Sequence, residues 1–347
     1  MLWLTFDTRK VFPHVAEPAG VDHTFDLTTQ LGDAIVQLRL PMAGSPLRYV
    51  NSYLLEDDGA YTLVDCGWNC GDVLAALHEG LARCGIALKD VTRVLVTHAH
   101  YDHYGLAGTL RRSGLRELLL HRLDWAFARL LLTDPAATDR AADEWIARNG
   151  LRIDEPFDDV HGRLSELTEP TQLLEDGDRI GRLRAVWTPG HTPGHLCFLD
   201  TRSGKMLTGD HILDPITPHV GVWGERGENP LDAYVASLHK VAALGASGVL
   251  PAHGEPFADL QRRVDELLAH EAGRQAQVLA ALTRGAGDAT TVARAIPWTR
   301  RERPFDELAP AHQQFAVAET LAHLEAARAR GLVARDADAT PYAYALA

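Results

Sequence analysis

The sequence has few cysteines and methionines, with 4 Cys and 3 Met among 347 residues, and no apolar run long enough to span a bilayer. No two of the cysteines have the spacing of a paired cysteine metal site, so we expect reduced, mostly buried thiols. The opening MLWLTFDTRK has no basic segment followed by an apolar core, as a secretory signal would have. We therefore expect a cytoplasmic protein that does not enter a membrane.

Basic residues are also scarce. The chain has 34 Lys and Arg against 47 Asp and Glu, a net charge of −13, and most of this excess lies before residue 258. An acidic body disfavours nucleic-acid binding, which depends on neutralising phosphates. With 46% hydrophobic residues the composition is globular, and 347 residues exceed what one core supports, which predicts one large domain and one smaller domain.

The pattern before residue 257 alternates short apolar strands with amphipathic helices, which predicts a layered α/β core. Residues 122–160 interrupt this alternation with two expected helices separated by Asp134 and Pro135. Such an insertion either packs on the surface with no further role or forms a lid or wall beside a substrate-binding site. The sequence leaves both alternatives open.

Helical patterns dominate beyond residue 258 and end in two short β-prone segments. Three helices followed by a hairpin suggest a small winged-helix-like unit at about 275–347. We therefore expect a catalytic domain over 1–265 and a C-terminal helical domain over 266–347. His270 and Arg274, one helical turn apart, either form a surface pair or reach toward the site entrance, and we expect the surface pair.

In the stretch RVLVTHAHYDHYG a short apolar segment, which we expect to be a strand, is followed within seven residues by four potential metal ligands, His98, His100, Asp102 and His103. Buried imidazoles and carboxylates lose their hydration unless they find partners, so such a group needs a common purpose. Three further candidates also follow apolar runs, at glycine-containing corners: His191 in TPGHTPGH, Asp210 in LTGDH and His253 in PAHG. Because α/β proteins build sites from loops beyond strand ends, we expect these side chains to converge.

The first expected ion would be held by histidines. His98 and His100 alternate along an extended segment and so face the same way, and His191 completes a three-histidine set. Three imidazoles with one open position suit zinc.

The second expected ion would have mixed ligands, with Asp102, His103 and His253 around it and Asp210 between the two ions. A carboxylate rather than a thiolate in the bridging position gives the site a hard oxygen ligand, which iron and manganese also accept. We therefore expect two divalent ions, zinc first, with iron or manganese as alternatives.

The motif THAHYDH, followed in order by TPGHTPGH, LTGDH and PAHG, resembles the signature of the metallo-β-lactamase superfamily, and VDCG at 64–67 resembles its first motif. The resemblance covers about residues 30–257. It implies a four-layer αββα sandwich with the site at one edge. Within the superfamily the pattern is similar to the glyoxalase II and ribonuclease Z type of dinuclear hydrolase, and the tail to the lactamase-like protein 2 subgroup with its winged-helix-like unit.

The resemblance and the positions of residues near the motifs suggest further roles. Asp102 would orient the nucleophile and relay a proton, and Asp65 would support a ligand. His195, like His191, follows a Pro-Gly pair in TPGHTPGH. The family pattern uses His191 as the metal ligand, so we expect His195 to hydrogen-bond to a ligand rather than to be one. Tyr101 and His219 are candidates for the substrate pocket, with packing or surface roles as alternatives.

Two ions sharing a water supply hydroxide near neutral pH, which predicts hydrolysis. We expect cleavage of a small-molecule thioester, ester or lactone. One alternative is a phosphodiesterase or ribonuclease acting on single-stranded RNA. The expected winged-helix-like unit favours this alternative, and the net negative charge of the chain opposes it. Another is a mononuclear iron persulfide dioxygenase, which His253 opposes because it completes a second site. A homodimer is left open.

Overall fold

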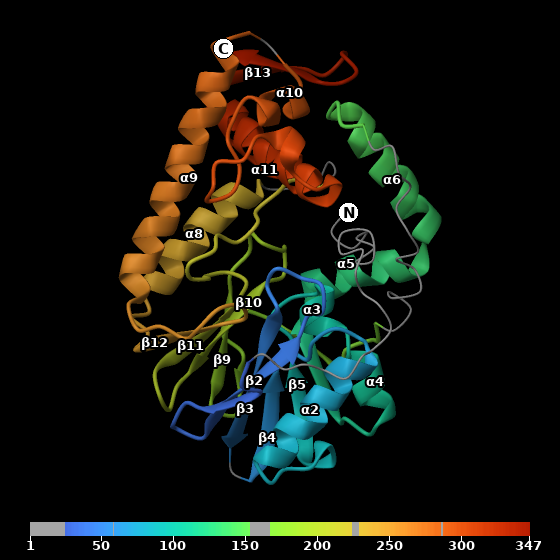
Figure 1. Cartoon of the computed structure of the whole chain (residues 1–347), viewed down its shortest axis with the longest axis vertical. Helices are drawn as coiled ribbons and strands as arrows, with labels where there is room; N and C mark the ends of the chain where they lie inside the picture. Colours follow the sequence, from blue (N-terminus) through green and yellow to red (C-terminus); the bar gives the residue numbers. More distant parts are fainter. Residues whose placement is uncertain (1–24, 58, 153–166, 224–228, 286) are drawn as a thin grey trace.

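The structure is a computed structural model that describes residues 25–57, 59–152, 167–223, 229–285 and 287–347. Its centre is a pair of β-sheets flanked by helices (Figure 1). No helix in these ranges is both long enough and apolar enough to cross a membrane. All four cysteines are free thiols, as expected, but only Cys66 and Cys197 are buried, and Cys70 is exposed.

The first sheet has seven strands whose spatial order follows the chain. They are β1 (Thr28–Gln30), β2 (Ile35–Pro41), β3 (Tyr49–Asp57), β4 (Ala60–Val64), β5 (Val91–Leu95), β6 (Glu117–His121) and β7 (Gln172–Leu174). Strands β1 to β4 pair antiparallel through short turns, whereas β4 to β7 pair parallel. Parallel pairing needs crossover segments, and the helix α2 (Gly71–Arg83) supplies the one between β4 and β5.

The second sheet has the order β12-β11-β10-β9-β8. Its strands are β8 (Arg179–Ile180), β9 (Leu183–Trp187), β10 (Leu196–Asp200), β11 (Lys205–Gly209) and β12 (Gly248–Pro251). Strands β8 to β11 are antiparallel, and β12 lies parallel to β11 after the crossover helix α8 (Pro230–Ala242).

The two sheets pack face to face. Their shared core contains Tyr53 and Leu95 from the first sheet and Phe198 and Leu250 from the second, all buried. The other face of the first sheet is covered by α2 and α4 (Ala107–Arg112), and that of the second by α8 and α9 (Leu260–Leu282). These layers form the expected αββα order, since strands buried on both sides need cover on both faces.

The segment expected as an insertion begins with two helices, α5 (Arg122–Thr133) and α6 (Pro135–Arg148), with Asp134 capping the second. Residues 153–160 of that segment lie outside the described residues. The side chain of Trp145 on α6 donates a hydrogen bond to the carbonyl of Val222 at 3.1 Å, and Thr290 donates to the carbonyl of Asn149 at 2.7 Å. The insertion therefore packs on the C-terminal part of the chain.

The C-terminal part contains α9, α10 (Ala289–Arg294), α11 (Pro310–Ala329) and an antiparallel hairpin of β13 (Val333–Asp336) and β14 (Ala343–Leu346). These helices and this hairpin occur in the order that the sequence suggested (Figure 1). Helix α9 runs without a break through residues 265 and 266, where we placed the domain boundary.

The expectation that Arg274 lies on the surface is wrong. Its side chain is buried between α9 and α11, where its Nε lies 3.0 Å from Glu319 and its guanidinium covers the ring of Trp298. Helix α11 covers this face of α9, which the spacing of His270 and Arg274 alone did not reveal.

Candidate metal centre

The candidate ligands lie just beyond strand ends, at one edge of the paired sheets. The loop 96–100 follows β5 and leads into the single turn α3 (Tyr101–Tyr104), which carries Asp102 and His103. His191 follows β9, Asp210 comes directly after β11, and His253 follows β12. Strands from both sheets thus bring the side chains to one place, as the sequence predicted.

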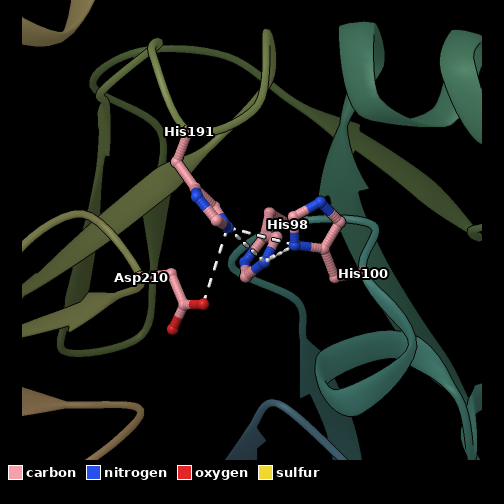
Figure 2. A group of neighbouring side chains, drawn as sticks. All are labelled: His98, His100, His191 and Asp210. Carbon is pink, nitrogen blue, oxygen red and sulfur yellow. Dashed lines mark hydrogen bonds and ion pairs between the residues drawn. The ribbon is translucent and has the colours of Figure 1, made fainter. Parts of the chain in front are cut away.

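The first group consists of His98, His100, His191 and Asp210 (Figure 2). The Nε2 atom of His98 lies 2.8 Å from Nδ1 of His100 and 3.2 Å from Nε2 of His191, and the latter lies 3.0 Å from Nδ1 of His100. The carboxylate of Asp210 approaches Nε2 of His191 to 3.5 Å. The ligand atoms of the group all lie within 4.8 Å of one another.

These spacings fit a cation. Imidazole nitrogens around a tetrahedral zinc ion, each at about 2.0–2.1 Å, stand roughly 3.3 Å apart. Burial, and next the neighbouring imidazoles, hold the pKa values of His98 and His100 well below their usual range. Both rings are therefore neutral, which is the form that binds metal ions.

The second group consists of Asp102, His103 and His253. The Oδ2 atom of Asp102 lies 3.2 Å from Nε2 of His253 and 3.5 Å from Nε2 of His103. Burial acts to lower the pKa of His103, but the carboxylates of Asp102, Asp65 and Asp210 raise it well above its usual value. A cation bound between these groups would replace the proton that this negative surrounding favours.

Asp210 faces both groups. Its Oδ2 points to His191, whereas its Oδ1 lies 3.6 Å from Nε2 of His103 and 3.5 Å from Nε2 of His253. Among the described residues these last three atoms, Oδ1 of Asp210 and Nε2 of the two histidines, are buried and accept or donate no hydrogen bond. Buried polar atoms of this kind call for a partner, and the donor set suits a divalent ion.

Four of the five candidate histidine ligands have a hydrogen-bond partner at Nδ1, on the side of the ring away from the group, which favours the tautomer with a proton there. His100 instead faces the first group through Nδ1. Nδ1 of His103 lies 2.8 Å from Asp65, and Nδ1 of His98 lies 3.0 Å from the hydroxyl of Thr97. Backbone carbonyls are the partners of His191 and His253. Nδ1 of His191 lies 2.8 Å from the carbonyl oxygen of His219, and Nδ1 of His253 lies 3.1 Å from the carbonyl oxygen of Tyr49. A proton held on Nδ1 leaves the Nε2 lone pair for a metal.

The remaining predicted residues lie around the two groups. Nε2 of the buried His195 accepts a hydrogen bond from the backbone N–H of Asp210 at 3.2 Å, so this ring supports a candidate ligand. His219 contributes its carbonyl to His191, while its own ring lies against Phe315 on α11, with Nε2 3.0 Å from that residue's carbonyl. Tyr101 is half-buried against the core of the first sheet.

Sequence reasoning missed two supporting residues. Thr97 links Asp65 to His98 through its hydroxyl, and its position inside the motif was a usable signal. Asp124 is fully buried at the start of α5 and accepts a hydrogen bond from the backbone N–H of Ala99, 2.8 Å away. It lies in no motif, and no local pattern marks it.

Comparison with known proteins places the chain in a family. The sequence profile of the metallo-beta-lactamase superfamily matches residues 45–253. The lactamase-like protein vrtG of Penicillium aethiopicum is 30% identical over 262 residues, covering 73% of this chain and 67% of its own length. The protein YobT of Bacillus subtilis is 34% identical over 164 residues, which are 46% of this chain and 61% of that protein's length.

Two solved structures match most of the chain. A metallo-beta-lactamase family protein from Thermus thermophilus is 33% identical, with a TM-score of 0.77 over 90% of this chain and 99% of its own. A beta-lactamase domain protein from Burkholderia ambifaria is 29% identical, with a TM-score of 0.78 over 92% and 93%. Both likenesses extend well beyond residues 45–253. The chain belongs to the metallo-beta-lactamase superfamily of metallo-hydrolases.

Proposed function

We propose that the protein is a dinuclear metallo-hydrolase that cleaves a small-molecule thioester, ester or lactone. The observation that carries this proposal is the position of Asp210, whose two carboxylate oxygens face two separate groups of candidate ligands. One ion would be held by His98, His100 and His191, the other by Asp102, His103 and His253, with Asp210 between them. Zinc suits the three imidazoles best.

Two divalent ions, when bound, lower the pKa of the water that they share and stabilise developing negative charge. The chain's own residues then orient the reaction. Burial would raise the pKa of Asp102, but His103 and His253 hold it well below its usual range, so this side chain is an anion at neutral pH. As a carboxylate it orients the attacking water and accepts its proton, which it can pass to the leaving group.

The choice of substrate class rests on charge and on the surroundings of the site. The chain carries a net charge of −13, which opposes a polyanionic substrate. Helix α11 reaches the segment that supports His191 through the contact of Phe315 with the ring of His219, and the insertion packs on the same part of the chain through Trp145. We propose that these helices form walls of a pocket for a small molecule. The order of the motifs THAHYDH, TPGHTPGH, LTGDH and PAHG supports our proposal that the chain is of the glyoxalase II and ribonuclease Z type.

We also propose that residues 1–265 form the catalytic domain and 266–347 a winged-helix-like domain. The order of helices and the terminal hairpin support this reading of the tail. A winged-helix-like unit favours a second candidate function, cleavage of single-stranded RNA, although residues 266–347 contain 10 acidic against 9 basic residues. The persulfide dioxygenase alternative requires a single iron, whereas His253 and Asp102 face each other in a second group.

The test is a substrate panel. Zinc-loaded and manganese-loaded protein would be assayed on thioesters, esters and lactones beside single-stranded RNA. We expect turnover of at least one class of small acyl substrate and no RNA cleavage. RNA cleavage without acyl turnover would establish the second candidate instead, and oxygen consumption by protein holding one iron would establish the third.

A further inference from the structure

Asp124 lies outside every motif, yet it is buried within the metal centre's supporting structure. It stands in the first turn of α5, and its side chain is not exposed to solvent. Its Oδ2 accepts hydrogen bonds from the backbone N–H of Ala99 and from the hydroxyl of Thr192, both at 2.8 Å. Its Oδ1 accepts from the backbone N–H of Gly194 at 2.6 Å.

These three donors belong to the two loops that present the histidines of the first group. Ala99 stands between His98 and His100, and Thr192 directly follows His191. The first loop follows β5 of one sheet, and the second connects β9 and β10 of the other sheet. One carboxylate therefore ties together loops from two different sheets at the point where their imidazoles converge.

The second loop approaches Asp124 so closely that only glycine fits at position 194. A Cβ atom added at Gly194 would lie 2.5 Å from the backbone nitrogen of Asp124 and 2.7 Å from its Oδ1. The start of α5 is itself fixed, because the ring of His121 accepts a hydrogen bond from the backbone N–H of Leu123 at 3.2 Å. Hydrogen bonds to an ionised acceptor are among the stronger ones in proteins.

We infer that Asp124 is a positioning residue that sets the distances between His98, His100 and His191, and so determines the affinity of the three-histidine ion. The inference rests on the proposed function, since it assumes that these rings hold a metal. It gives the first turn of the insertion a role at the site. Asp65, in contrast, bonds directly to His103 of the second group and reaches the first group only through the hydroxyl of Thr97.

Cobalt binding can show which group of ligands Asp124 supports and which group Asp65 supports, because the visible absorption of bound cobalt depends on its ligands. The His253→Ala variant weakens the second group, and the His191→Ala variant weakens the first. Asp124→Asn would be added to each, because the amide keeps the size of the side chain but has one acceptor oxygen in place of two. Loss of a group that supports metal ligands lowers metal affinity roughly 10- to 100-fold.

We expect Asp124→Asn to weaken cobalt binding roughly 10-fold or more in the His253→Ala background, and to leave it unchanged in the His191→Ala background. Asp143→Asn, a change of the same kind on the exposed face of α6, is the matched control and should alter neither. Unchanged cobalt affinity in the His253→Ala background, or equal losses in both backgrounds, would overturn the inference. If the wild type itself binds no cobalt, the proposed function fails instead.

A second pair of variants serves if Asp124→Asn does not fold. Thr192→Val removes one of the three hydrogen bonds with little change of shape, and Thr192→Ser keeps the hydroxyl. The inference predicts weaker cobalt binding in the His253→Ala background for the valine variant and recovery for the serine variant. Equal binding by both variants would contradict it.

Discussion

The Oδ2 atom of Asp65 lies 2.8 Å from Nδ1 of His103, while the Oδ1 atom of the same carboxylate accepts the backbone N–H of Thr97 at 2.8 Å. Asp65 holds a left-handed backbone conformation, with φ of 61°, directly after strand β4. Few residues other than glycine adopt this conformation, and aspartate is among those that do so most readily. The carboxylate thereby fixes both the start of the ligand loop and the ring of a proposed ligand.

Replacing Asp65 by asparagine should impair the second ion more than the first. The amide cannot accept from both His103 and Thr97, and its NH₂ group turned to His103 would favour the tautomer with a proton on Nε2. We expect roughly 10- to 100-fold weaker metal binding by the second group and a matching loss of hydrolysis. Cobalt titration in the His191→Ala background measures this, and unchanged affinity there would contradict the role of Asp65.

The ring of His219 should influence the site from outside it. Its Nε2 bonds to the carbonyl of Phe315 on α11, and its own carbonyl bonds to His191. His219→Ala frees this segment from the helix, so we expect weaker binding of the first ion and a lower unfolding temperature. Cobalt titration and thermal unfolding check both effects. His78→Ala, which removes an exposed histidine on α2, is the control, and equal behaviour of the two variants would argue against the link.

Stability should depend on pH through Glu271, which lies between α9 and α11. Burial raises the pKa of Glu271 from 4.5 to about 7, against the opposing charges of His270 and Arg274. His323, Glu319 and Tyr234 are further titratable groups near this cluster. The folded protein therefore binds a proton here that the unfolded chain releases, and this contribution to stability is complete below about pH 4.5 and lost as the pH rises through about 7.

Glu271→Gln removes this dependence because the amide stays neutral. We expect the variant to match the wild type near pH 5 and to exceed its free energy of unfolding by about 1–3 kcal/mol near pH 8. Denaturant unfolding of the metal-free proteins at both pH values measures the difference. A difference that does not change with pH would show that Glu271 titrates normally.

The candidate ligands could be predicted from the sequence because each follows an apolar strand at a corner. A strand that ends in His98 and His100 places its polar residues at the sheet edge, and the same holds for Asp210 after β11. The layered fold followed from the alternation of strands and helices.

The supporting residues could not be predicted in the same way. Asp124 reaches Ala99 and Gly194 only because α5 starts beside both loops, which depends on contacts between distant segments. The contribution of His219 to His191 comes from a backbone carbonyl, which has no sequence signature. Arg274 looked like a surface residue because the helix that covers it, α11, lies more than thirty residues further along the chain.

Metal analysis of the wild type and of the Asp210→Ala variant tests the central claim most directly. Asp210 has one oxygen toward each group, so its removal leaves both groups without their shared ligand. The proteins would be dialysed against zinc and freed of excess, and metal content and hydrolysis measured on the same samples. We predict two ions per chain in the wild type, and loss of both metal and activity in the variant. Full activity of the variant, or a wild type that holds a single ion, would contradict the dinuclear site.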